Sequence, residues 1–355
     1  LWLQRKRTPF ACAAKRSRVH YGYGAIGYKQ APLKLWSRGS KTLLVFLHFP
    51  TPHEPASTMS IAGSFTRVAA AVIPHLSFPV ASSVGRSLGS LAWALDARHR
   101  AVAMKNLFLA FPKLTESHRR QLAQKSFQQV GRTAVEMLWS TALNDQTLGK
   151  IAVFEGRQHL DAAIAEGRGA LITTAHFGNW ELMGVALAHI GVPMNVIVRT
   201  IDDPQVESVL NRLRTRTGAR VIHKDNGVRP ALRALRAGEV VGVLVDQNTL
   251  PSQASFVPFF GEMAATTRVS AQLHVRSGAP VIMLFCVPEG ERYRFVIEPL
   301  DTTGVSVQGT DKVEQLTAAM TTQIERHIRL CPEAWLWIHD RWRSRPPSTD
   351  EKTAR

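Results

Sequence analysis

Between Ala170 and Leu300, short apolar runs rich in Val, Ile and Leu alternate with stretches of helical periodicity. The runs are continuous rather than alternating with polar residues, which is typical of strands buried on both faces. The sequence therefore predicts an α/β fold with a mostly parallel central sheet covered by helices. The predicted strands are Leu171–Thr174, Met194–Val198, Arg220–Ile222, Val240–Val245, Val281–Val287 and Tyr293–Ile297, and the predicted intervening helices are Glu181–Ile190, Pro204–Thr217, Gly227–Ala237 and Thr267–Ser277.

Charge separates the start of the chain from the rest. The 355 residues include 44 Lys and Arg against 27 Asp and Glu, a net charge of +17, which draws a protein to polyanions. Residues 1–58 carry ten basic residues and one acidic residue and have no sustained period. We interpret them as a disordered leader or an over-extended start; a basic arm or a targeting peptide are the alternatives. The three cysteines are far apart, which favours reduced thiols over a disulfide framework.

The segment 59–97 is apolar and helical in pattern, and it is predicted to associate with a membrane. Its stretch Val68–Gly85 has eighteen residues without a charge, the minimum for a membrane-spanning helix, but Pro74 and Pro79 weaken that interpretation. A helical hairpin packed on the body, a single marginal span and an interfacial helix flanked by Arg67 and Arg86 stay open. The predicted organisation is a leader (1–58), this segment (59–97), an α/β domain (98–346) and a polar tail (347–355).

In parallel sheets, ligands bind beyond the carboxyl ends of the strands, so catalytic residues are sought directly after each apolar run. His176 follows the run that ends at Thr174. An imidazole has the ordinary pKa that suits proton abstraction near neutral pH. Glu181 lies five positions on, where a carboxylate can fold back to orient the imidazole, and Gly178 lies at a helix N-terminus that favours negative charge.

The wider string is more specific, because it reads His-Phe-Gly-Asn-Trp-Glu from His176 to Glu181. It resembles the His-x4-Asp/Glu box of the glycerolipid acyltransferase superfamily, in the form used by the bacterial lipid A late acyltransferases, the lauroyl and myristoyl transferase family. The resemblance covers about Ser64 to Pro346. Further segments that agree in order and spacing are Asn106-Leu107 with Ala110-Phe111-Pro112, Gly131-Arg132 with Glu136, Val198-Arg199, Asp246-Gln247, Val257–Gly261, Ala265-Thr266-Thr267, and Trp335–His339 with Arg345-Pro346.

The resemblance implies an αβα acyltransferase fold and the transfer of a fatty acyl group from an acyl carrier protein thioester to a hydroxyl of a lipid A precursor. It implies that His176 deprotonates this hydroxyl as general base and that Glu181 orients His176. No covalent acyl-enzyme is needed, and no cofactor is expected. Location at the cytoplasmic face of the inner membrane follows from the same resemblance, with an anionic membrane surface as a further partner.

Substrate-binding candidates come from the box and from the ends of two other strands. Asn179 lies within the box. Arg199 follows the strand Met194–Val198, where it either stabilises an oxyanion, binds a phosphate or forms a salt bridge at the rim. Asp246 and Gln247 close the strand Val240–Val245, where they position the acceptor or a loop, or cap a helix or turn.

Two apolar segments have alternative interpretations. The loop around Phe259 and Phe260 either lines an acyl channel or belongs to the core. The tail Trp335–Arg345 interleaves tryptophans with basic residues, a pattern that suits the membrane interface better here than nucleic-acid stacking, although Trp335 and Trp337 could also cap the core. We therefore expect no nucleic-acid partner.

Other chemistries have weaker support. No His-Glu-x-x-His motif or paired histidine spacing is present, so no metal site is expected. The stretch Gly85–Gly89 matches Gly-x-Ser-x-Gly, but no buried strand precedes it, and we interpret the match as accidental. The rival functions are an acyltransferase for another glycolipid such as a phosphatidylinositol mannoside, a thioesterase, and a non-enzymatic basic protein that binds membrane or nucleic acid.

Overall fold

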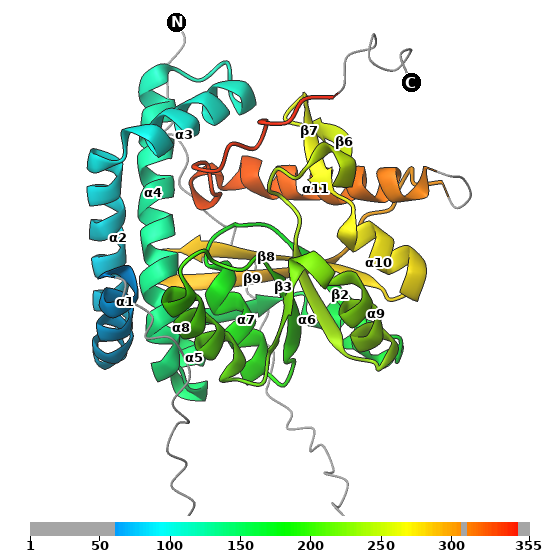
Figure 1. The fold of residues 1–355 in the computed structure, drawn as a ribbon, viewed down its shortest axis with the longest axis horizontal. Helices are drawn as coiled ribbons and strands as arrows, with labels where there is room; N and C mark the ends of the chain where they lie inside the picture. Colours follow the sequence, from blue (N-terminus) through cyan, green and yellow to red (C-terminus); the bar gives the residue numbers. More distant parts are fainter. Residues whose placement is uncertain (1–60, 307–310, 347–355) are drawn as a thin grey trace, which may run out of the picture. The chain divides into compact units, whose positions relative to one another are not determined.

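The computed structural model describes residues 61–306 and 311–346. The predicted leader and polar tail lie outside these residues. The centre of the described part is a seven-stranded sheet with the strand order β1-β9-β8-β2-β5-β3-β4 (Figure 1). Its neighbouring strands are parallel except for β8 and β9. The strands are β1 (Ala152–Glu155), β2 (Ala170–Thr174), β3 (Met194–Val198), β4 (Arg220–His223), β5 (Val240–Leu244), β8 (Val281–Glu289) and β9 (Arg292–Pro299).

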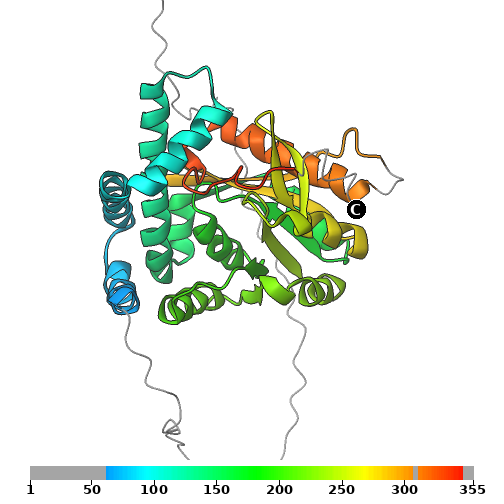
Figure 2. The ribbon, with the colours of Figure 1, turned by 45° about the horizontal axis from the view of Figure 1, so that its top comes forward.

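Helices cover both faces of this sheet (Figures 1 and 2). They are α5 (Asp145–Ile151), α6 (Arg157–Ala165), α7 (Trp180–His189), α8 (Pro204–Thr215), α9 (Val228–Arg236), α10 (Val269–Ser277) and α11 (Lys312–Leu330). Side chains alternate across β2: Ile172 packs with Leu182 of α7, whereas Thr173 contacts Ser270 of α10. Because each face is covered, the strands are apolar on both sides, and the predicted α/β fold with a mostly parallel sheet is confirmed.

A two-stranded hairpin stands apart from this sheet. It consists of β6 (Ala254–Phe259) and β7 (Glu262–Thr267), which pair antiparallel. The predicted apolar loop around Phe259 and Phe260 is therefore wrong up to Phe259, which belongs to strand β6, whereas a turn follows at Phe260 and Gly261. Phe260 and Gly261 have positive φ values of 55° and 82°, as a tight two-residue hairpin turn requires.

The helices before the sheet are α1 (Ile61–Val72), α2 (Phe78–Leu95), α3 (Ala97–Ala110) and α4 (Glu116–Trp139). The long helix α4 packs along α2, where three glycines let the two backbones approach closely. A Cβ on Gly89 would lie 2.2 Å from the backbone oxygen of Phe127, and one on Gly131 would lie 2.2 Å from that of Gly85. The glycines of the Gly-x-Ser-x-Gly match therefore serve helix packing.

The segment predicted to associate with a membrane folds from residue 61 onward as α1 and α2, separated by a short 3-10 turn that contains Pro74. Helix α1 also contacts α8, so both helices pack on the body. No helix in the described ranges combines the length and the apolar character needed to cross a bilayer.

The chain after α11 runs beside the loops that follow β2 and β5, and we call residues 335–345 the C-terminal strap. Trp335, Trp337 and Trp342 are each at most 1% exposed, and Arg341 is fully buried. Arg341 donates to the backbone oxygen of Ala265 in β7. The interpretation of this segment as a membrane-interface belt is wrong, because its aromatic rings fill the interior.

Candidate active site

A cavity of about 240 Å³ lies beyond the carboxyl ends of β2, β3 and β5, where open α/β sheets bind ligands. His176, Glu181, Arg199 and Gln247 line it. The structure thus brings four of the eight predicted site residues to one cavity.

His176 presents its imidazole to this cavity. Its Nδ1 lies 2.8 Å from Oδ1 of Asp246. A carboxylate only accepts hydrogen bonds, so Nδ1 carries the proton and Nε2 holds the lone pair. The amide nitrogen of Gln247 lies 3.2 Å from Nε2 and donates to it. The arrangement leaves Nε2 as a hydrogen-bond acceptor, which is the state of a general base.

Asp246 is buried behind the imidazole and is held by three donors. Besides Nδ1 of His176, it accepts the backbone N–H of His176 at 2.9 Å and the indole N–H of Trp335 at 2.7 Å, both at Oδ2. Burial alone would raise the pKa of this carboxyl, but the hydrogen bonds that it accepts from His176 and Trp335 hold the pKa below its ordinary value. Asp246 therefore stays ionised near neutral pH.

The expected contact between Glu181 and His176 is wrong. The Glu181 carboxylate forms a bidentate ion pair with Arg214 of α8, with N–O distances of 2.6 and 3.0 Å. Glu181 lies in the first turn of α7, which faces α8, and the imidazole finds its carboxylate on the neighbouring strand instead. Asp246, expected to position the acceptor or a loop, is that carboxylate.

The loop between β2 and α7 is fixed by its backbone. Gly178 has a φ of 61°, and a Cβ there would lie 1.6 Å from the backbone oxygen of Cys286, so no other residue fits. Its N–H donates to the backbone oxygen of Ala334, and the N–H of Leu336 donates to the backbone oxygen of His176. The C-terminal strap thereby holds the loop on which His176 lies.

The strap also holds the loop that follows β5. Nε2 of His339 accepts the backbone N–H of Asn248 at 3.0 Å. Burial lowers the pKa of His339 to about 4, so its ring is neutral and able to accept at neutral pH. Asn248 itself lines the cavity, so this hydrogen bond shapes the cavity wall.

The remaining predicted residues differ in placement. Arg199 is 80% exposed in its side chain and lies 3.6 Å from Asp202, an ion pair at the rim. Asn179 is fully buried and does not line the cavity. Phe259 and Phe260 pack in an aromatic cluster with the strap tryptophans and do not line the cavity either. Of the two alternatives for Phe259 and Phe260, the structure thus shows packing in the core.

The cavity wall is cationic. Arg214 and Lys224 line it beside Arg199, and Nη1 of Arg214 is buried without a hydrogen-bond partner among the residues that the structure describes. An arginine with a buried free N–H is suited to a phosphate or a developing oxyanion. Sequence reasoning missed Arg214, since helix α8 and its end carry several arginines and no pattern marks one of them.

A second, mainly apolar cavity adjoins the first. The two share Trp180, Val198 and Val243. Met194 lines the second cavity together with Gly242, where an added Cβ would lie 3.4 Å from the Met194 sulfur. A small residue at 242 therefore keeps this space open.

Within residues 61–306 and 311–346, no group of three or more His, Cys, Asp or Glu side chains is placed to hold a metal ion.

The chain is similar in sequence to acyltransferases of lipid A biosynthesis. The lipid A biosynthesis lauroyltransferase of Escherichia coli K12 is 28% identical over 278 residues, which cover 78% of this chain and 89% of that protein. The lipid A biosynthesis palmitoleoyltransferase of the same strain is 31% identical over 277 residues, 77% of this chain and 88% of that protein. The crystal structure of the 1-acyl-sn-glycerophosphate acyltransferase of Thermotoga maritima covers 72% of this chain and 99% of its own, with 18% identity and a TM-score of 0.33.

The model of the family described as bacterial lipid A biosynthesis acyltransferase matches residues 55–344, which include every element of the sheet and the whole cavity described above. The chain therefore belongs to the bacterial lipid A biosynthesis acyltransferase family.

Proposed function

We propose that this member of the family, an acyltransferase of lipid A biosynthesis, moves a fatty acyl group from a carrier-protein thioester to a hydroxyl of a lipid A precursor, with His176 as general base. The observation that carries the proposal is the accepting Nε2 of His176 in the cavity, with the ionised Asp246 on its other nitrogen. A hydroxyl is a weak nucleophile at its own pKa and needs such a base.

The reaction then proceeds in two proton transfers. Nε2 of His176 takes the proton of the acceptor hydroxyl as its oxygen bonds to the thioester carbonyl carbon. The carbon–sulfur bond breaks in the resulting tetrahedral intermediate, and the imidazolium returns the proton to the departing thiolate. The products are an ester and a free thiol, and His176 ends neutral. Asp246 stabilises the imidazolium between the two transfers.

The cationic wall supports a role in holding negative charge. The free Nη1 of Arg214 is buried, where a charged hydrogen bond is stronger than at the surface. Glu181 fixes the other two guanidinium positions. In our proposal Arg214 binds the carbonyl oxygen as it becomes an oxyanion, while Lys224 and Arg199 at the same cavity bind phosphate groups of the donor or acceptor.

The apolar second cavity is a suitable place for the fatty acyl chain, because it opens from the first beside Trp180 and is lined by Met183, Met194 and Val196. Methionine side chains adapt to irregular apolar ligands. The acyl chain would lie against α7 and β3, while the thioester lies near His176.

The surface of α9 supports a carrier protein as donor. Arg229, Arg233 and Arg236 lie on one exposed face of this helix, and no ion pair involves them in the described ranges. Helix α9 begins four residues after the cavity-lining Lys224. An unpaired cationic row on this helix suits an acidic protein surface, whose approach it would accelerate at low ionic strength.

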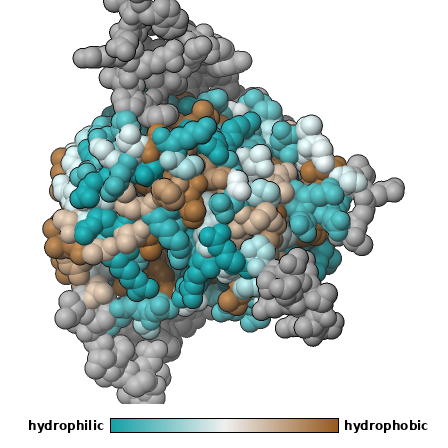
Figure 3. Space-filling view, turned by 90° about the horizontal axis from the view of Figure 1, so that it is seen from above, coloured by the Kyte–Doolittle hydropathy of each residue, from teal (hydrophilic) through white to brown (hydrophobic). Residues whose placement is uncertain are grey.

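The outer face of α1 to α3 supports docking on an anionic membrane. Phe65, Val68, Leu88, Leu91 and Leu95 are each at least 45% exposed there. Figure 3 looks down on the molecule of Figure 1 and shows apolar residues at its left edge, the side of α1 and α2. Together with nearby arginines, such a face suits the headgroup and acyl boundary of a bilayer.

The decisive test combines two measurements. Mass spectrometry of lipid A from cells lacking and regaining the gene should show one acyl group lost and restored. Purified His176→Ala should lose transfer by about 10²–10⁴-fold in rate and keep the melting temperature of the wild type. Near-normal transfer by this variant would refute the mechanism, and unchanged lipid A would refute the acceptor.

A further inference from the structure

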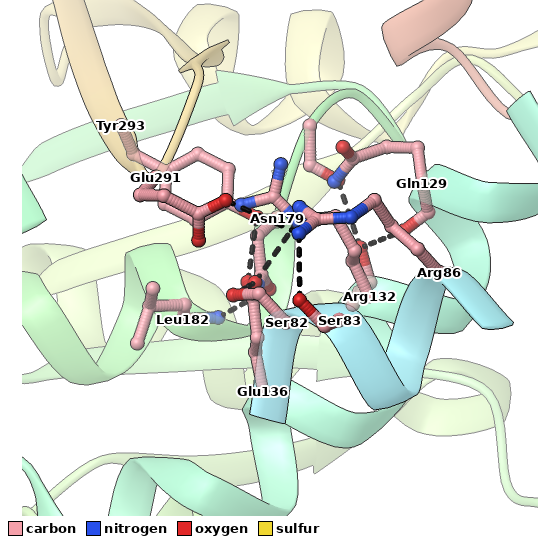
Figure 4. A network of polar contacts seen from close by, with 12 residues as sticks. Ser82, Ser83, Arg86, Gln129, Arg132, Glu136, Asn179, Leu182, Glu291 and Tyr293 are labelled. Atoms are coloured by element: carbon pink, nitrogen blue, oxygen red, sulfur yellow. Dashed lines mark hydrogen bonds and ion pairs between the residues drawn. The ribbon is translucent and has the colours of Figure 1, made fainter. Parts of the chain in front are cut away.

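A buried carboxylate lies directly beneath the catalytic loop and takes no part in the chemistry proposed above. Glu136 of α4 is fully buried and accepts four hydrogen bonds (Figure 4). Oε1 accepts from Ser82 of α2 at 2.5 Å and from Arg132 at 3.0 Å. Oε2 accepts from Tyr293 of β9 at 2.5 Å and from the amide nitrogen of Asn179 at 2.8 Å. A charge this far from water needs such compensation.

All four partners act as hydrogen-bond donors to Glu136. Arg132 has only donors, and burial together with the charge of Glu136 raises the pKa of Tyr293 well above its ordinary value, so its hydroxyl keeps the proton and donates it. All four contacts are therefore donations to a carboxylate.

The carboxylate thereby fixes which way the Asn179 amide faces. Its NH2 group points to Glu136, so its oxygen points to the N–H of Leu182, from which it accepts at 2.9 Å. This second bond is the N-cap of α7. If the amide were turned over, two oxygens would face each other at one end and two N–H groups at the other, and both bonds would be lost.

The capped turn begins with the residues that line the cavity. Trp180 packs its ring edge on the imidazole of His176, with 5.1 Å between the ring centroids, and Glu181 holds Arg214. The same helix α4 also bonds the preceding residue, because Thr133 donates to the backbone oxygen of Gly178 at 2.9 Å. The loop is thus clamped by α4 from one side and by the C-terminal strap from the other.

We propose that Glu136 is a positioning residue for the acyl transfer: through the orientation of Asn179 it sets the first turn of α7 against His176. This proposal rests on the proposed function, because the clamped loop carries the general base. It assigns a role in catalysis to a side chain that does not touch the cavity.

Exchanging the two side chains tests the proposal. In Glu136→Gln the amide oxygen of the new side chain must stay toward Arg132, so its NH2 group faces Asn179. The Asn179 amide then has to turn over, and it loses its hydrogen bond to the N–H of Leu182, the N-cap of α7. In Asn179→Asp two carboxylates face each other. Each single variant should lose about 10–100-fold in kcat/KM, the effect of a small misplacement of catalytic groups. The double variant Glu136→Gln/Asn179→Asp restores the donor, the acceptor, the cap and the single negative charge, and should recover to within about threefold of the wild type.

Two further variants separate positioning from general stability. Tyr293→Phe removes the other donor at Oε2 and leaves Asn179 in place, so it should lower the melting temperature and keep kcat/KM within about threefold. Asn179→Ser caps α7 without needing an oriented amide, so adding Glu136→Gln to it should cost little activity. Comparison of Asn179→Ser with Asn179→Ser/Glu136→Gln keeps the proposal testable if Asn179→Asp does not fold.

A double variant that folds but is no more active than the weaker single variant would overturn the proposal, and so would a full loss on adding Glu136→Gln to Asn179→Ser. Activity of His176→Ala would instead refute the proposed function, so the two failures are distinguishable.

Discussion

Replacing Asp246 by asparagine removes one charge from the site and changes almost no volume. The amide can face His176 in two ways. With its NH2 group on Nδ1, it satisfies both donors at Oδ2, but it forces the imidazole proton onto Nε2 and abolishes the base. With its oxygen on Nδ1, the tautomer is correct, but the NH2 group meets the backbone N–H of His176 and the indole N–H of Trp335.

These two buried donors set the magnitude. A buried donor without an acceptor costs about 1–3 kcal/mol, so the competent orientation is disfavoured by roughly 3 kcal/mol, or about a hundredfold. Loss of the charged hydrogen bond to the imidazolium adds about 1.5–3 kcal/mol, a further factor of about 10 to 100. We expect Asp246→Asn to lower kcat about 10³–10⁴-fold.

Initial rates of acyl transfer by the purified variant measure this loss, with a thermal melt to verify folding. Asp202→Asn is the matched control, because it makes the same chemical change at an exposed rim position and should leave kcat within about twofold. A loss of less than about tenfold in folded Asp246→Asn would refute the assignment of Asp246 as the residue that orients the base.

Three further predictions address the surroundings of the site. Gly242→Ala adds a methyl group at ordinary contact distance from its neighbours, so the variant should fold and prefer a shorter acyl chain than the wild type. A competition assay with mixed thioesters measures this preference, and an unchanged chain length would show that the second cavity does not hold the acyl chain. The folded pKa of His339 lies near 4, below its unfolded value, so the stability that its ring contributes is present above about pH 6.5 and is lost as the pH falls through 4. His339→Gln should therefore lose less melting temperature over this pH range than the wild type. An equal dependence of melting temperature on pH in the two proteins would contradict the role of the ring. Leu88→Ser with Leu91→Ser should weaken sedimentation with anionic vesicles while the melting temperature stays unchanged, and equal binding would exclude this face from the membrane contact.

Most of the sheet was predictable, because central strands such as β2, β5 and β8 are buried on both faces and therefore appear as continuous apolar runs in the sequence. The edge strand β1 is only partly buried, and it was not predicted. The hairpin of β6 and β7 was not predicted either. Strand β6 alternates between buried and less buried residues, and Pro258 with the glycine of the turn made the segment resemble a loop. The last helix of the sheet layer, α11, also had no counterpart among the predicted elements.

For the site, the sequence pointed to the proposed base, His176, but not to the carboxylate that binds it. Thr174 of β2 pairs with Leu244 of β5, so the residues two positions beyond each, His176 and Asp246, come side by side. That contact depends on strand order and register, which link positions 70 residues apart, whereas Glu181 stands close only along the chain. The prediction that Trp335 lies at a membrane interface failed for a related reason. A segment of aromatic and basic residues can have the same composition at a membrane interface and in the interior of a protein.

The indole N–H that Trp335 donates to Asp246 belongs to the part of the described chain that is translated last. The Asp246 carboxylate therefore lacks one of its three donors until the ribosome has synthesised the strap and the strap has docked across the loops. A nascent chain would carry the His-x4-Glu box long before its geometry is complete, so acyl-transfer competence should arise late and all at once. Shortening the chain from its carboxyl end to before residue 335 should abolish turnover even though every strand is retained.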